Sequence, residues 1–171
     1  MNTIKKITFT VIGLFVMTTA MNAQKWSFDN KRDYQEDWFG IDLGVGGMKD
    51  LNGTGVDFGL RYLHSYSRYI AWNAVNLKAI ANTKDFSKSI TPQIMTGIRL
   101  TSPNFLQDLS AFGGFKAGYG YNIDGKDGGF CYEVEAGVNV TRNLFVGFAY
   151  NNQKLDGLQL KYSAFRIGFN I

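Results

Sequence analysis

Within the final ten residues, 162–171, positions 164 to 171 alternate between small or polar side chains and large apolar ones. Successive side chains of an extended strand point to opposite faces, so this stretch predicts a strand with one wholly apolar face. A soluble protein rarely ends on such a strand, because an exposed apolar edge pairs with other chains. A transmembrane β-barrel removes the edge by closing its last strand onto its first, and lipid solvates the apolar side. The apolar face carries Phe165, Ile167, Phe169 and Ile171, and the other face carries Ala164, Arg166, Gly168 and Asn170.

Similar alternating segments of about ten residues recur from Trp38 onward, separated by turn sequences such as Asp50-Leu51-Asn52-Gly53. Glycine is abundant at 20 residues, proline is scarce at 2, and no long stretch has helical periodicity. We therefore predict an all-β chain that folds as an eight-stranded antiparallel transmembrane β-barrel, since bacterial barrels of this kind have an even number of strands. The predicted strands are 38–47, 54–64, 69–81, 89–101, 110–123, 129–140, 144–151 and 160–171.

The predicted strands separate into an apolar face and a face of glycines and charges. The apolar face takes every second residue of 39–45, 56–62, 75–79, 115–121, 132–138 and 144–150, with Ile94, Ile98 and Leu100. The charges number five positive and four negative, so they nearly neutralise one another if they share the interior, where an unpaired charge is costly. The glycines beside them leave room for long side chains. The predicted interior charge network is Asp42, Asp57, Arg61, Lys78, Arg99, Lys116, Glu133, Glu135 and Arg166.

Alternation alone does not distinguish inside from outside. In a soluble lipocalin-like carrier, the charges would face water and the apolar face would line a ligand cavity. Three features favour the membrane: the apolar terminal strand, the tyrosines and phenylalanines toward strand ends, and tight turns at 65–68 and 141–143. The turns at 65–68, 101–109 and 141–143 would face the periplasm, and loops at 48–53, 82–88, 124–128 and 152–159 would face outward. These loops are short for an elaborate receptor.

Residues 1–23 have the three parts of a secretory signal peptide: Lys5 and Lys6, an apolar run, and a small-residue end at Ala23. We expect cleavage before Gln24, with residues 24–37 as a polar periplasmic segment and 38–171 as the barrel. Cleavage would lower the formal net charge from +4 to about +2, and no basic cluster predicts nucleic-acid binding. The only cysteine, Cys131, cannot form an internal disulfide.

Few residues suggest chemistry. His64 is the only histidine, and its neighbour Ser65 would point to the opposite strand face, which disfavours a hydrolase pair. One histidine and one cysteine make no metal site, and we expect no cofactor. Glu133 and Glu135 share a face about 7 Å apart, where an acid–base pair is conceivable; five cations favour salt bridges instead. The carboxylates of 124–129 do not have calcium-loop spacing, so this stretch predicts a turn.

Residues 137–150 combine a glycine-containing strand, a tight Thr-x-Asn-Leu turn and an alternating strand ending in tyrosine. This hairpin resembles those of small outer-membrane β-barrels of the outer-membrane protein A type, and 111–121 is similar to the preceding glycine-rich strand of that superfamily. Phe169-Asn170-Ile171 resembles the C-terminal signal read by the barrel-insertion machinery, although an aromatic final residue is more usual. The resemblance implies location in the outer membrane of a Gram-negative bacterium and brings no catalytic residue.

Our first functional hypothesis is a non-enzymatic one: a structural or partner-binding barrel of the cell envelope whose interior is filled and not an open pore. Outer-membrane lipid, the insertion machinery and an envelope protein are the expected partners. The alternatives are an outer-leaflet lipid-modifying enzyme and a soluble carrier of a hydrophobic ligand.

Overall fold

The computed structural model describes residues 36–49, 53–67, 69–83, 90–105, 108–123, 126–155 and 158–171. The predicted signal peptide and most of the predicted periplasmic segment lie outside these residues. In the described part of the chain, no helix has the length and apolar character needed to cross a membrane.

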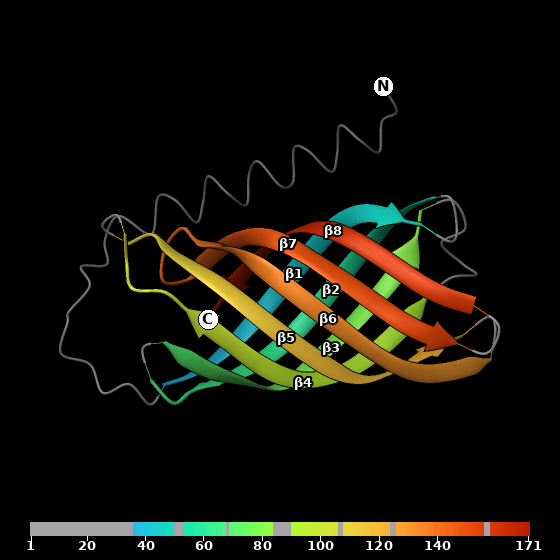
Figure 1. Ribbon diagram of the computed structural model, residues 1–171, viewed down its shortest axis with the longest axis horizontal. Helices are drawn as coiled ribbons and strands as arrows, with labels where there is room; N and C mark the ends of the chain where they lie inside the picture. Colours follow the sequence, from blue (N-terminus) through green and yellow to red (C-terminus); the bar gives the residue numbers. More distant parts are fainter. Residues whose placement is uncertain are drawn as a thin grey trace, which may run out of the picture. The chain divides into compact units, whose positions relative to one another are not determined.

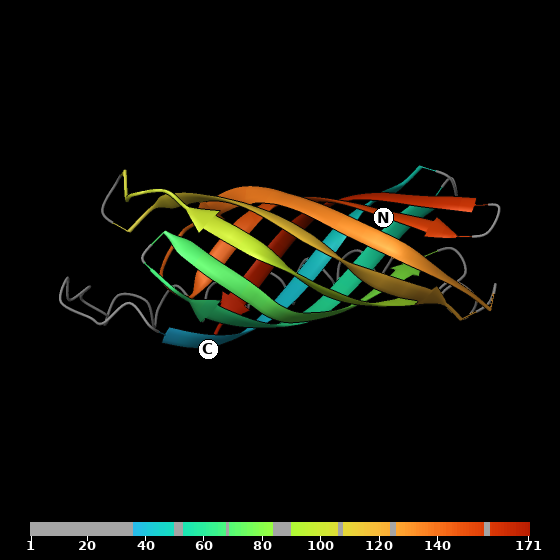
Figure 2. The ribbon, with the colours of Figure 1, turned by 60° about the horizontal axis from the view of Figure 1, so that its bottom comes forward.

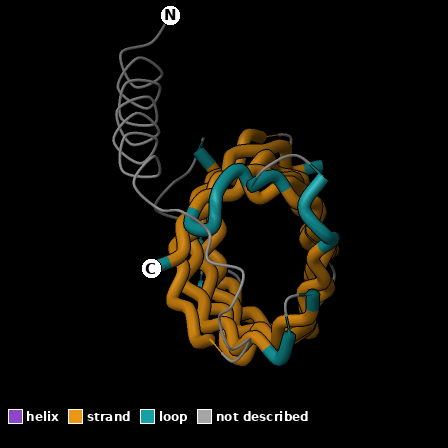
Figure 3. Tube along the Cα trace, turned by 90° about the vertical axis from the view of Figure 1, so that its left-hand side faces the viewer, coloured by secondary structure: helices purple, strands orange, loops and turns teal. Residues whose placement is uncertain are grey.

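Eight antiparallel strands form one closed barrel in which each strand pairs with its neighbours in sequence. Figures 1 and 2 show the tilted strands from two sides, and Figure 3 shows the ring that they form, viewed from one end. The fold class predicted from alternation is confirmed. The strands are β1 (Glu36–Met48), β2 (Gly53–Ser65), β3 (Ile70–Asn82), β4 (Thr91–Thr101), β5 (Ser110–Asn122), β6 (Asp127–Asn139), β7 (Leu144–Leu155) and β8 (Leu158–Asn170).

Pairing between β1 and β8 closes the barrel. Its register runs from Gly40 opposite Asn170 to Met48 opposite Tyr162. Beyond the ladder, Phe39 and Ile171 exchange backbone hydrogen bonds of 3.3 and 2.7 Å. The apolar edge seen in the sequence is therefore paired along its length. We call the end where β1 begins and β8 finishes the terminal end, and the opposite end the loop end.

Most predicted strands match the observed ones to within two residues, but the predicted loop at 152–159 is wrong. There β7 continues to Leu155 and β8 starts at Leu158, with Lys154 opposite Gln159. The prediction failed because the alternation of apolar outward and polar inward residues reverses near the loop end. Leu155 and Leu160 are buried, whereas Lys154 and Gln159 are exposed, so the segment lacks the apolar outer face of the other strands.

Burial follows the predicted faces. Outward residues such as Phe39, Ile94 and Phe148 are 65%, 55% and 69% exposed, whereas the charged face is buried. Leu144, predicted on the outer face, is an exception because it is only 8% exposed. It is the first residue of β7, and its carbonyl accepts hydrogen bonds from the backbone N–H groups of Val140 and Thr141 as the preceding turn folds against it.

The β3–β4 ladder contains a bulge between Asn73 and Asn76, which both point inward and are fully buried although they are three residues apart. A bulge frees backbone groups from the ladder. On the outer side, the Thr96 hydroxyl donates to the Asn73 carbonyl at 2.9 Å, and the Trp72 indole N–H donates to the Thr96 oxygen at 3.0 Å. Thr96 therefore gives the Asn73 carbonyl a hydrogen-bond partner beside the bulge.

Substituting Thr96→Val should lower the free energy of unfolding by about 1–3 kcal/mol, because the Asn73 carbonyl would lose its partner in an apolar surround. Equilibrium urea unfolding from lipid vesicles, followed by tryptophan fluorescence, measures this difference. Thr54→Val, at an exposed position of β2 near the loop end, is the control. Equal stability of the two variants would contradict the role assigned to Thr96.

Candidate functional site

The candidate site is the charged interior of the barrel. All nine side chains of the predicted charge network lie inside it, and none is more than 4% exposed. They come from seven strands, β1 to β6 and β8, so no local stretch of sequence assembles the site. They form two groups, one around Glu133 and one nearer the terminal end.

Glu133 on β6 is the centre of the first group. Its Oε1 accepts from Lys116 Nζ at 2.9 Å and from Arg166 Nη1 at 2.7 Å. Its Oε2 accepts from Arg166 Nη2 at 3.1 Å and from Lys78 Nζ. One fully buried carboxylate therefore binds three cations that come from β3, β5 and β8. Breaking such a pair leaves charge unpaired in a low-dielectric interior, which is costly.

Glu135 and Asp57 extend this group. Lys116 Nζ also reaches Glu135 Oε2 at 2.8 Å, and Arg166 Nη2 lies 3.3 Å from Asp57 Oδ1. The Tyr162 hydroxyl donates to Asp57 Oδ2 at 2.9 Å. The two glutamates thus share Lys116, as a structural network requires, and they do not form an isolated acid–base pair.

The glycines beside the charges make room for them, as the sequence suggested. A Cβ on Gly44 would lie 2.0 Å from Asp57 Oδ2, and one on Gly40 would lie 2.5 Å from Arg61 Nε. Any larger residue at either position would displace a member of the network.

The second group lies nearer the terminal end and combines charge with aromatic rings. Arg61 Nη1 is 3.3 Å from Asp42, and Arg61 Nη2 donates to Asn170 at 2.6 Å. Arg99 lies 3.6 Å from the centre of the Phe112 ring and 4.7 Å from that of Phe145, and it donates to Asn139 at 2.7 Å. No described carboxylate forms a salt bridge with Arg99. Two aromatic faces and an amide therefore hold the extra positive charge.

Toward the loop end the interior becomes uncharged. Gln93, Asn151 and Gln153 form an amide cluster, with Gln93 Nε2 donating to Asn151 at 3.1 Å and to Gln153 at 2.8 Å. Sequence reasoning did not single out these amides, although the inward parity of their strands could have identified them. A buried apolar cluster lies beside the amides, since Asn151 pairs with Tyr162 and Gln153 pairs with Leu160. Its members are Met48, Ile80, Leu160, Tyr162 and Ala164.

His64 lies outside this network. Its Nδ1 is 2.6 Å from Asp37 Oδ1 at the terminal end, and both side chains are partly exposed. Among the described residues, no hydroxyl forms a hydrogen bond with His64, and no group of three potential ligands could hold a metal ion. Asp124 and Gly125 of the predicted turn lie outside the described residues.

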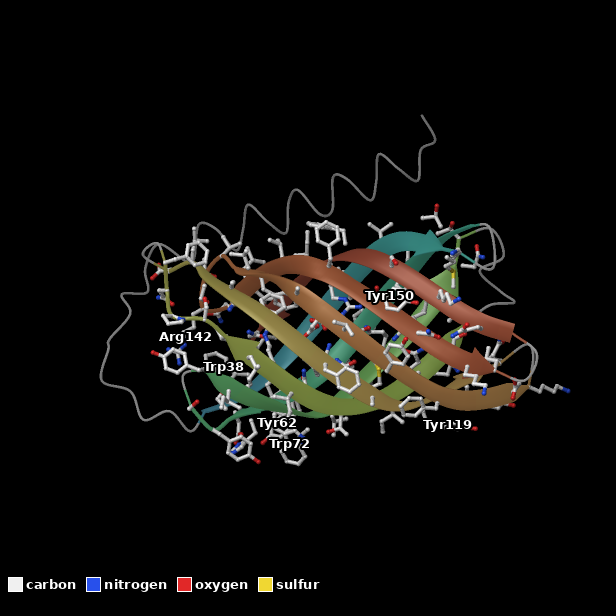
Figure 4. The ribbon with its side chains drawn as sticks, in the orientation of Figure 1. Trp38, Tyr62, Trp72, Tyr119, Arg142 and Tyr150 are labelled. Atoms are coloured by element: carbon white, nitrogen blue, oxygen red, sulfur yellow. The ribbon has the colours of Figure 1, made fainter. Side chains whose placement is uncertain are left out.

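Aromatic residues lie on the outer surface toward both ends of the barrel. Figure 4 shows Trp38, Tyr62, Trp72 and Arg142 toward the terminal end, and Tyr119 and Tyr150 toward the loop end. The Arg142 guanidinium lies 4.6 Å from the centre of the Trp38 ring. Amphipathic rings of this kind are typical of membrane–water interfaces.

No protein-family model matches this chain, and no curated protein matches it significantly in sequence. The solved structures that share its fold include the following three. Neisserial surface protein A has 15% identity and a TM-score of 0.58, with 79% of this chain and 94% of that chain covered. The outer membrane enzyme PagL has 12% identity and a TM-score of 0.56, with 77% and 98% covered. The N-terminal β-barrel domain of Pseudomonas aeruginosa OprF has 12% identity and a TM-score of 0.50, with 80% and 98% covered.

The chain therefore has the fold of the small eight-stranded outer-membrane β-barrels, as the resemblance implied. Its outside is apolar and its inside is charged, which is opposite to a soluble carrier with an apolar cavity. The lipocalin-like alternative is thereby excluded.

The substitution Glu133→Gln should lower the free energy of unfolding by about 3–5 kcal/mol, because Lys78, Lys116 and Arg166 would then face an uncharged amide. Urea unfolding from lipid vesicles measures the loss. Lys126→Gln changes an exposed lysine in the turn before β6 and should stay within about 0.5 kcal/mol of wild type.

A double-mutant cycle between Arg166→Met and Glu133→Gln tests whether these groups are coupled. We expect a coupling free energy of about 0.5–3 kcal/mol, because the second substitution removes an interaction that the first has already broken. If the two losses simply add, the pair does not stabilise the interior as argued above.

Proposed function

We propose that this chain is an outer-membrane β-barrel with a structural or partner-binding role in the cell envelope, and that it provides no open path for solutes. The observation that carries the proposal is the filled interior, in which Glu133 binds three cations at the centre of the barrel. Eight strands enclose just enough space for side chains. The charged groups occupy one part of that space, and the amide and apolar clusters lie side by side toward the loop end.

The outer surface supports lipid as the first partner. An apolar band with aromatic residues toward both ends suits hydrocarbon flanked by two interfaces. The C-terminal strand, with Phe165, Ile167 and Phe169 on its outer face, suits recognition by the barrel-insertion machinery. An envelope protein partner would contact the lipid face or the connections at the two ends.

The second hypothesis, a lipid-modifying enzyme, has weaker support. PagL shares the fold and is described as an outer membrane enzyme, but a likeness at 12% identity extends to the fold alone. Here His64 pairs with Asp37, and among the described residues no serine or other nucleophile is hydrogen-bonded to its ring. A general base needs such contact with the group that it activates. We therefore favour the non-enzymatic role.

Reconstitution tests the filled interior. Liposomes that contain the purified protein should swell in a small sugar no faster than empty liposomes, because the interior side chains exclude solute. A general-diffusion porin in matched liposomes is the positive control. Swelling at a rate near that of the porin would overturn the proposed absence of an open path.

Location is tested separately by cell fractionation. The protein should be recovered with the outer membrane and should require detergent for extraction, because its outer surface is apolar. Recovery as a dissolved periplasmic protein would contradict the proposal. An unchanged lipid A profile in cells lacking the protein would count against the enzymatic alternative.

A further inference from the structure

The outer surface near the loop end carries a graded set of side chains on β7, β8 and β1. Closest to the middle of the barrel, Phe148 and Phe165 pack edge to face with ring centres 5.5 Å apart. Two residues further along, Tyr150 lies opposite Ser163, and Ser163 lies opposite Gly47. The surface thus changes from aromatic rings to hydroxyl groups within about 7 Å along the strands.

The next row toward the loop end is polar and basic. Asn152 lies opposite Tyr132 on one side and Lys161 on the other, and the Lys49 backbone N–H donates to the Lys161 carbonyl at 3.1 Å. Neighbouring strands are about 4.8 Å apart, so this row spans roughly 14 Å of the surface. Lys154 continues the basic character one step beyond it. We call this set, Tyr132, Asn152, Lys154, Lys161 and Lys49, the basic row.

The lysines of the basic row have no carboxylate partner in the part of the chain that the structure describes. Among the described residues, Lys49, Lys154 and Lys161 form no salt bridge, and no carboxylate lies in the row. The amide of Asn152, by contrast, is fixed: its Nδ2 donates to the Tyr132 hydroxyl at 3.0 Å, and its Oδ1 accepts from Gln159 at 3.1 Å. The row therefore combines three lysines with a Tyr132 hydroxyl that the buried Asn152 amide holds in place.

Beside the basic row, Gly47 leaves the surface open. A Cβ built on Gly47 has no atom within 4 Å, and the residue is exposed. This open position lies between the Lys49 and Val45 positions on the outer face of β1. A headgroup lying against the lysines could thus rest on backbone at Gly47 while its chains follow Val45, Phe165 and Phe148.

We propose that this surface binds a phosphorylated glycolipid of the outer leaflet, of the lipid A class. Its phosphates would contact Lys49, Lys154 and Lys161, its sugar would contact Tyr132 and Ser163, and its acyl chains would lie along Phe148 and Phe165. From the middle of the barrel toward the loop end, this surface presents apolar, hydroxyl and ammonium groups in turn. Acyl chains, sugar and phosphates follow the same order along such a lipid. The Tyr132 and Ser163 hydroxyls suit a sugar headgroup better than a simple phosphodiester. This inference rests on the proposed outer-membrane location.

Binding is tested on the full-length mature protein in mild detergent by native mass spectrometry. Lipid A, its dephosphorylated form, phosphatidylglycerol and phosphatidylethanolamine serve as separate probes. Wild type should retain lipid A in preference to the other three. K49Q/K161Q should lower lipid A retention about tenfold to thirtyfold, since each lysine near an anionic lipid contributes about a fivefold increase in binding.

Two further variants sharpen the test. Gly47→Trp should lower retention by filling the open position, without changing any charge. Lys126→Gln, which removes an exposed lysine from the turn before β6, should leave retention unchanged and controls for the loss of one positive charge. A loss of about fivefold in Lys126→Gln, the same per lysine as in K49Q/K161Q, would show nonspecific charge attraction and would overturn the inference.

The remaining outcomes separate the two proposals. Equal retention of phosphorylated and dephosphorylated lipid A, or preference for phosphatidylglycerol, would overturn the glycolipid site while the protein remained in the membrane fraction. Loss of binding in Asp50→Asn/Asp156→Asn, whose positions are in the neighbouring turns of the sequence, would indicate carboxylate-bound metal in place of lysine contacts and would also overturn it. Failure of wild type to fractionate with the outer membrane would instead overturn the proposed function.

Discussion

The closure of β1 onto β8 is the constraint on which the rest of this structure depends. Hydrocarbon offers no hydrogen-bond partners, so an unpaired strand edge within it would leave a row of backbone N–H and C=O groups without hydrogen bonds. Once Gly40 to Met48 pair with Asn170 to Tyr162, every strand has two neighbours. The ring then has only two surfaces, and alternation assigns each side chain to one of them. At the β3 bulge, the Thr96 hydroxyl donates a hydrogen bond to the Asn73 carbonyl.

Closure also explains why the interior is built from charge. The interior of a closed ring with an apolar outside receives the polar half of every strand, and eight strands leave little room for water. Charges collected there must satisfy one another. Glu133 does so for Lys78, Lys116 and Arg166, and Phe112 and Phe145 provide faces for Arg99, which forms no salt bridge with a described carboxylate. The network ties strands that are far apart in sequence, so it holds the barrel in one arrangement.

The loop end shows where pattern reading fails. Alternation predicts the direction of a side chain only where the outer face is known to be apolar. Near the loop end the inner face becomes apolar and the outer face polar: Leu155 and Leu160 point inward, and Lys154 and Gln159 point outward. The strands continue, but beyond the apolar band the outer face meets a polar environment. The same exchange produces the basic row, which is why reading 152–159 as a loop also concealed a candidate binding surface.

The sequence by itself determined the strand number, most strand bounds and the partition of side chains into two faces, because a period of two residues is a local property of the extended chain. Parity also placed the nine charges of the predicted network on one face. The tertiary structure showed that this face is inside, and it alone decided that Glu133 and not Glu135 is the centre of the network and that Tyr162 and Asn151 belong to it. Those outcomes depend on the register and tilt of strands that are far apart in the sequence. Ring closure brings their side chains together, and a pattern within one strand does not predict such contacts.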